Sequence, residues 1–202
     1  DCTGLTSIVI PDTVTVIEEY AFARSALKEV TLGKNITEIQ KCAFYETAIT
    51  EAEIPDSVTY ISHCAFSGCK LLKTVKLSKS LVGFGQEVFE NCISLTEIEI
   101  PKSLQYADSS WGPFYGCDNL SRVVFEEGVT EIARGLFRDC TGLTSIVIPD
   151  TVTVIEKNAF ANSALKEVTL GKNITEIQQG AFSGTAITEV EIPDSVTYIG
   201  YY

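Results

Sequence analysis

The sequence contains no methionine, one histidine and one tryptophan, and basic residues are scarce, with 15 Lys and Arg against 27 Asp and Glu for a formal net charge of −12. This charge opposes binding to nucleic acid, whose phosphates are contacted by Lys and Arg, and docking on anionic lipid. The sequence also lacks an apolar run of roughly 18 residues, so we expect no membrane insertion. Because His63 stands alone, a His-based triad or a multi-His zinc site cannot be built from this chain. We therefore expect neither enzymatic activity nor a cofactor or metal.

What the sequence does contain is a repeat. Eight Phe residues recur at intervals of 22, 22, 23, 25, 23, 23 and 22 residues: Phe22, Phe44, Phe66, Phe89, Phe114, Phe137, Phe160 and Phe182. Aligning them places the other apolar residues in five columns over about nine repeats, which we number coil 1 to coil 9 from the N-terminus. A fixed period of this length indicates a stacked array in which each coil contacts only its neighbours and shares a continuous core with them.

The local pattern predicts two short segments in each coil. The segment L-x-x-I-x-I, as in Leu5 to Ile10, alternates in apolar character and predicts a strand. Equivalent strands of successive coils would run parallel, about 4.8 Å apart, as one sheet. In five coils a proline follows this strand and ends its pairing: Pro11, Pro55, Pro101, Pro149 and Pro193. The segment V-x-x-I-x-x-x-A-F predicts, on the opposite side, a second short strand and then a helical or 3₁₀ turn.

The whole pattern, C-x-x-L-x-x-I-x-I-P-x-x-V-x-x-I-x-x-x-A-F in residues 2–22, resembles the BspA-like (TpLRR) class of leucine-rich repeats over essentially the whole chain. The resemblance implies a leucine-rich repeat solenoid, an α/β or mainly β horseshoe or right-handed superhelix, as a single domain over residues 1–202. It also implies a secreted or cell-surface protein that binds a protein or glycan ligand, as in adhesion to a host or to other cells. A structural spacer that displays another domain, or an accessory segment of a larger surface enzyme, remains an alternative, because a repeat motif specifies a fold better than a ligand.

A second level of repetition is present. Residues 1–61 recur as residues 139–199, six coils later, with 53 of 61 positions identical. The chain starts in the middle of one repeat and stops in another before its Ala-Phe pair. We therefore expect a piece of a longer array, truncated at both ends, whose uncapped ends favour self-association.

The seven cysteines fall into two registers. Five stand three residues before the first apolar column and are expected to be buried free thiols in a small niche: Cys2, Cys69, Cys92, Cys117 and Cys140. Cys42 and Cys64 lie one coil apart, a separation within disulfide range, so a bridge and two free thiols are both open.

Two groups of residues are candidates for binding. The first is a charged strip at outward positions of the first strands: Glu51, Glu53, Lys76, Glu97, Glu99 and Arg122. These residues either pair with one another on a hydrated sheet or form a patch that selects a partner by charge complementarity. The second lies in the 25-residue coil, which carries two extra residues and the only Trp: Tyr106, Trp111 and Tyr115. Either Trp111 is a contact residue, as expected of an insertion in a repeat, or it covers a thin part of the core beside Ala107.

Overall fold

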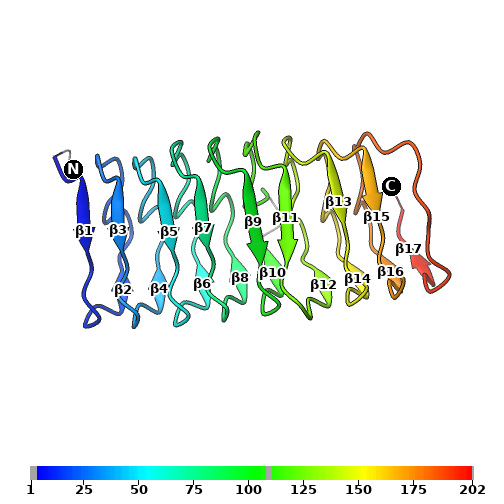
Figure 1. Cartoon of the computed structure of the whole chain (residues 1–202), viewed down its shortest axis with the longest axis horizontal. Coiled ribbons are helices and arrows are strands. Elements are labelled where there is room, and N and C mark those ends of the chain that lie inside the picture. Colours follow the sequence, from blue (N-terminus) through cyan, green and yellow to red (C-terminus); the bar gives the residue numbers. More distant parts are fainter. Residues whose placement is uncertain (1–3, 108–110, 202) are drawn as a thin grey trace.

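The computed structural model describes residues 4–107 and 111–201, and within these ranges it consists of parallel strands and turns without a helix. The coils stack side by side in a nearly straight row along the long axis (Figure 1). The predicted solenoid is therefore confirmed, and the second segment of each coil forms the predicted short strand. The turn after that strand is neither α-helical nor 3₁₀ in the described residues.

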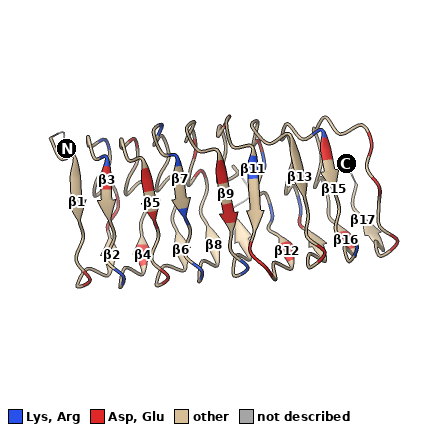
Figure 2. Ribbon diagram, in the orientation of Figure 1, with Lys and Arg blue, Asp and Glu red and all other residues tan. Residues whose placement is uncertain are grey.

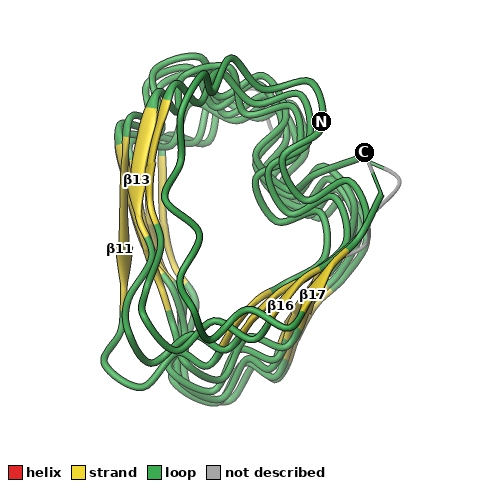
Figure 3. Cartoon of the chain, turned by 90° about the vertical axis from the view of Figure 1, so that its right-hand side faces the viewer, coloured by secondary structure: helices red, strands yellow, loops and turns green. Residues whose placement is uncertain are grey.

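Each coil has three sides (Figure 3). The first, which we call the strand face, carries β1 (Ser7–Val9), β3 (Glu29–Thr31), β5 (Glu51–Glu53), β7 (Thr74–Lys76), β9 (Glu97–Ile100), β11 (Arg122–Phe125), β13 (Ser145–Val147) and β15 (Glu167–Thr169). The second carries two-residue strands: β2 (Val16–Ile17), β4 (Glu38–Ile39), β6 (Tyr60–Ile61), β8 (Gly83–Phe84), β10 (Tyr106–Ala107), β12 (Glu131–Ile132), β14 (Val154–Ile155), β16 (Glu176–Ile177) and β17 (Tyr198–Ile199). The third, which we call the turn side, is formed by the turns around each of the eight recurring Phe residues.

The Phe residues that reveal the repeat form a continuous aromatic column through the core. Neighbouring rings stack nearly parallel, with centroids 5.1 Å apart for Phe44 and Phe66 and 5.8 Å apart for Phe114 and Phe137. The backbone N–H of Phe44 also donates to the carbonyl of Ala65 in the next coil, at 2.8 Å. Stacked aromatic pairs of this kind stabilise a core by about 0.5–1.5 kcal/mol each beyond burial alone. Each coil therefore depends on both of its neighbours for a complete core.

The sequence predicts one continuous sheet on the strand face, but the structure has a series of two-stranded sheets there. β1 pairs with β3, β5 with β7, β9 with β11 and β13 with β15, and no ladder joins one pair to the next in the described part of the chain. We call each such pair of coils a two-coil unit. The Glu126 N–H donates to the Ile100 carbonyl within the unit of β9 and β11, at 3.0 Å. A proline has no N–H, so the corresponding bond between units cannot form from Pro55, Pro101 or Pro149.

Side chains reinforce the same division. The carboxylate of Asp12 accepts the backbone N–H of Lys34 at 2.9 Å, in the other coil of its unit. Equivalent bonds join Lys79 to Asp56 at 2.8 Å and Lys172 to Asp150 at 2.9 Å. In the remaining unit, formed by β9 and β11, the donor and acceptor coils exchange places. The Lys102 N–H of the first coil donates to the carboxylate of Glu126 in the second. The alternation of Pro-Asp with Gly-Lys or Ser-Lys in the sequence therefore marks the two coils of a unit.

Coil 9 departs from the pattern. The columns predict a ninth strand on the strand face around Val190, but residues 186–193 form no strand in the structure. Val190 and Ile192 are 39% and 41% exposed, whereas their equivalents in inner coils are largely buried. A strand here could pair with β15 only across a unit boundary, where no ladder forms on the strand face in the described residues.

Candidate binding surface

All six residues of the predicted charged strip lie on the strand face. Figure 2 shows acidic residues on β5 and β9 and basic residues on β7 and β11. Lys76 forms an ion pair with Glu53, and Arg122 forms one with Glu97. Glu53 raises the pKa of Lys76 by hydrogen bonding to it. Both ion pairs lie within two-coil units and are largely exposed, so their contribution to stability is small.

The two remaining carboxylates of the strip differ from these four. Glu51 and Glu99 have no ion-pair partner among the described residues. The structure therefore supports charge pairing for four residues of the strip and leaves two glutamates available to an external group.

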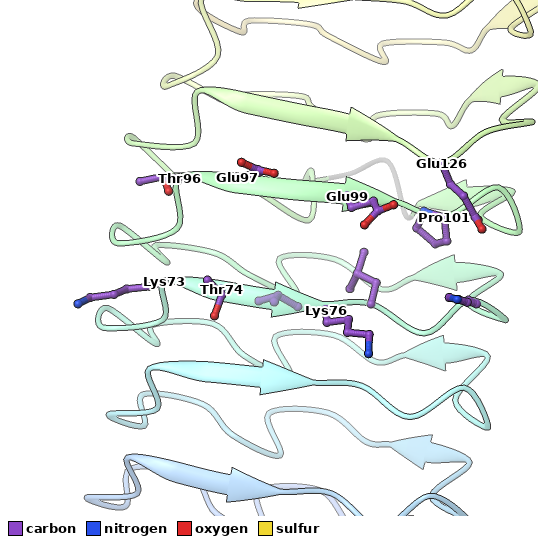
Figure 4. Close-up of a pocket in the computed structure, with 11 residues that line it drawn as sticks. Lys73, Thr74, Lys76, Thr96, Glu97, Glu99, Pro101 and Glu126 are labelled. Carbon is purple, nitrogen blue, oxygen red and sulfur yellow. The ribbon is translucent and has the colours of Figure 1, made fainter.

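A cleft of about 420 Å³ opens between β7 and β9, where two units meet. Lys73, Lys76 and Lys79 line it from coil 4, and Glu97, Glu99 and Glu126 from coils 5 and 6. Figure 4 shows Glu97 and Glu99 at opposite edges of β9, with Glu99 at the edge that faces β7. The ion pairs of Lys76 and Glu97 reach away from this cleft into their own units, so no ion pair between described residues closes it.

Clefts of similar size occur at two other unit boundaries. One of about 500 Å³ lies between β3 and coil 3, and one of about 490 Å³ lies between β15 and coil 9. The three clefts share a lysine from the preceding unit, a glutamate and a proline: Lys34, Glu53 and Pro55; Lys79, Glu99 and Pro101; Lys172, Glu191 and Pro193. The strand face therefore carries a series of clefts at a spacing of two coils or a multiple of it.

The lysines of the two outer clefts are already paired. Lys34 lies 3.0 Å from the carboxylate of Asp12, and Lys172 lies 3.1 Å from that of Asp150. The backbone N–H of Lys34, and then its side chain, lower the pKa of Asp12, which keeps this pair charged. Among the described residues Glu191 has no ion pair, like Glu99. In the two outer clefts the charged groups without an ion pair are therefore mainly carboxylates, whereas Lys73 and Lys79 of the central cleft also have no ion pair among the described residues.

The structure does not bring the three predicted aromatic residues together. Tyr106 lies on the second side, where its ring covers Gly83 and stacks with Tyr60 at 6.1 Å between centroids. A Cβ on Gly83 would lie 2.4 Å from that ring, so the glycine makes room for it. Trp111 and Tyr115 lie on the turn side in edge-to-face contact at 5.4 Å, and Trp111 is 46% exposed. Residues 108–110 of the insertion lie outside the described residues.

The described cysteines are free thiols, including Cys42 and Cys64. Cys69 is fully buried, and its thiol donates to the Phe44 carbonyl of the previous coil at 3.1 Å. Cys92 and Cys117 make the equivalent bond. Burial raises the pKa of Cys69 to about 11, so the thiol stays protonated. The predicted role as small buried core residues is confirmed for this register, apart from Cys2, which lies outside the described residues.

The family model for the BspA type leucine rich repeat region, in six copies, matches residues 1–111 and 112–202. Among solved structures, a leucine rich cell surface protein from Faecalibacterium prausnitzii is 26% identical over 99% of this chain and 60% of its own, with a TM-score of 0.51. The pneumococcal vaccine antigen PcpA is 26% identical over 95% of this chain and 51% of its own, with a TM-score of 0.64. The T. pallidum leucine rich repeat protein, at 22% identity over 97% of this chain and 73% of its own, shares the fold, with a TM-score of 0.55.

No curated protein matches the sequence. The chain spans between half and two thirds of the F. prausnitzii and pneumococcal proteins. A repeat fold of this kind is commonly used for protein–protein interaction, because stacking creates extended surfaces. Because the family model covers both halves of the sequence and the chain folds as a solenoid of these repeats, the chain belongs to the BspA-type leucine-rich repeat family.

Proposed function

We propose that this chain is a protein-binding module whose strand face receives an extended, basic segment of a partner protein. The observation behind the proposal is the recurrence of clefts at unit boundaries, each with a glutamate at its edge. The formal net charge of −12 favours a basic partner, because a field of one sign attracts and orients a ligand of the other.

The spacing of the clefts fits an extended chain. Two coils span roughly 9.6 Å at the usual distance between strands. Three residues of a polyproline II segment make one turn, which places every third side chain on the same side, and span roughly 9.3 Å. A partner segment lying across the strands would therefore present every third side chain to a boundary position. Arg or Lys at those positions would meet Glu99 and its equivalents, in charge-assisted hydrogen bonds.

Two synthetic peptides of identical composition test the proposal. One carries an arginine at every third position, and the other carries the same arginines in one block. Binding is measured by calorimetry at low and at high salt. The spaced peptide should bind more tightly, and salt should weaken its binding because exposed charges are screened. Equal affinities would remove the spacing argument, and no binding of either peptide would leave the spacer alternative.

Matched variants locate the site. Glu99→Gln and Glu51→Gln remove unpaired carboxylates of the strand face and should weaken binding of the spaced peptide. Glu18→Gln removes one negative charge away from the strand face and should leave the affinity unchanged. If Glu18→Gln and Glu99→Gln have equal effects, attraction is due to net charge and the clefts are not the site.

We also propose a secreted or cell-surface location, with adhesion as the role of this binding. The support is the family, together with the F. prausnitzii relative, which is described as a cell surface protein. Fractionation of the source cells with an antibody against this chain tests the location, and recovery only from the cytoplasm would contradict it.

A further inference from the structure

The internal duplication shows which surface of the solenoid has changed. Eight positions differ between residues 1–61 and 139–199, and seven of them flank an Ala-Phe pair on the turn side. These seven are Glu19 and Lys157, Tyr20 and Asn158, Arg24 and Asn162, Lys41 and Gln179, Cys42 and Gly180, Tyr45 and Ser183, and Glu46 and Gly184. The outward residues of the strand face are identical in the two copies. Side-chain differences that distinguish one copy from the other are therefore concentrated on the turn side.

One position of the turn side, three residues before each Phe, brings side chains of adjacent coils within reach of one another. Glu19 and Lys41 occupy it in coils 1 and 2, and their charged groups lie 3.7 Å apart. In coils 5, 6 and 7 the same position is occupied by Trp111, Arg134 and Lys157. We call these three residues the Trp-Arg-Lys column.

Backbone contacts show that the three coils of this column are adjacent on the turn side. The N–H of Gly135, next to Arg134, donates to the carbonyl of Lys157 at 3.1 Å. A Cβ on Gly112, next to Trp111, would lie 3.0 Å from the carbonyl oxygen of Gly135. The glycine at this point lets coil 5 approach coil 6 closely.

Arg134 and Lys157 place two positive charges on adjacent coils. At the same repeat position, coils 1 and 2 carry an ion pair. Neither Arg134 nor Lys157 has an ion-pair partner in the described part of the chain. The carboxylate of Asp139, five residues after Arg134, accepts hydrogen bonds from Arg138 and Asn162. Like charges in directly opposite positions destabilise a sheet-like array. The two positive charges occur in a chain with an excess of acidic residues, and Lys157 replaces the Glu19 of the first copy.

We propose that the Trp-Arg-Lys column binds a carboxylated saccharide. The half-exposed indole of Trp111, held by the edge contact with Tyr115, offers an apolar face to the C–H groups of a pyranose ring. The guanidinium of Arg134 and the ammonium of Lys157 donate charge-assisted hydrogen bonds to the sugar carboxylate. A long polyanion such as nucleic acid is a poor fit, because the chain has a formal net charge of −12 and repels it.

A pair of sugars that differ only in their carboxylates tests this proposal. The protein is titrated with a hyaluronan tetrasaccharide and with the same tetrasaccharide after reduction of its carboxylates to alcohols. Trp111 is the only Trp, so its fluorescence reports on the column directly. The acidic sugar should change the emission in a saturable manner, and the reduced sugar should bind at least about tenfold more weakly. Equal binding of the two sugars, or no binding of either, would overturn the proposal.

Variants taken from the chain itself complete the test. Lys157→Glu introduces the residue that the first copy carries at this position, so the scaffold tolerates it, and Arg134→Gln removes the second charge. Each should weaken binding of the acidic sugar about tenfold or more. Lys41→Gln, which introduces the residue of the second copy, is the control and should bind as the unaltered protein does. Glu99→Gln should also leave sugar binding unchanged, which separates this site from the strand face. Unchanged binding in Lys157→Glu, or tighter binding of a poly-glutamate peptide than of the sugar, would contradict the assignment.

Discussion

Replacing one inner Phe of the aromatic column should destabilise the solenoid more than replacing a terminal one. Phe89 is fully buried, stacks on Phe66 and on Phe114 at 5.5 Å between centroids, and meets the edge of Phe84 at 6.0 Å. An aromatic side chain buries roughly 150–250 Å², which at about 25 cal/mol per Å² gives roughly 4–6 kcal/mol as an upper estimate. We therefore expect Phe89→Ala to lower the free energy of unfolding by about 3–5 kcal/mol, the usual cost of such a cavity.

Phe22 provides the matched control. It is partly exposed and stacks on a single ring, that of Phe44, at 5.3 Å. Phe22→Ala should cost roughly half as much as Phe89→Ala, because fewer contacts and less buried area are lost. Urea denaturation followed by circular dichroism measures both values. If the two variants lose the same free energy, the coils do not share one continuous core, and the nearest-neighbour description of this solenoid is wrong.

Three further results are expected. Gly171→Ala should lower the melting temperature markedly, because the new Cβ would lie 2.3 Å from the carbonyl oxygen of Pro149, a backbone atom that cannot move aside cheaply; an unchanged melting temperature would refute the close approach. The pKa of Asp150 is lowered by the backbone N–H and side chain of Lys172, so its stabilising effect is present above its unfolded pKa and is lost as the pH falls through its folded pKa. Asp150→Asn should therefore flatten the decline of stability below about pH 4, and an unchanged decline would argue against the bond. Burial raises the pKa of the Cys64 thiol to about 12, so at pH 8 it should be alkylated slowly in the folded protein. In denaturant without reductant all seven cysteines should react, and fewer than seven labels would indicate a disulfide.

The core could be predicted almost entirely from the sequence. The period of the Phe residues and the apolar columns define which side chains face inward, because stacked coils bury the same positions at every repeat. The buried thiols of Cys69 and Cys92 followed from the same register. These features depend on burial, and the buried positions can be identified in one sequence because apolar residues recur there in every repeat.

The division of the strand face into two-coil units was missed, although its signal is present. The sequence predicts that Pro55 and Pro101 end strands. Neither can donate an N–H to the preceding coil, and Gly33 and Ser78 alternate with them at the same position. The strand expected around Val190 does not form for a related reason: it could pair with β15 only across a unit boundary, where the described strand face has no ladder.

The candidate binding residues were harder to place. A linear sequence does not show that Tyr106 and Trp111, five residues apart, lie on different sides of the coil. Nor does the sequence mark Arg134 as a binding residue, because its place between Trp111 and Lys157 follows only from the stacking of the coils. Surface sites of a repeat protein depend on which positions of successive coils coincide in space, and this alignment becomes informative only once the three sides of the coil are known.

Binding of a partner segment in the clefts at the unit boundaries can be observed residue by residue. Chemical-shift mapping is carried out on isotope-labelled protein titrated with the peptide that carries an arginine at every third position. Shifts are expected only at β7, β9 and the equivalent boundary residues around Glu53 and Glu191. Shifts confined to the second side or the turn side, with the strand face unaffected, would contradict it.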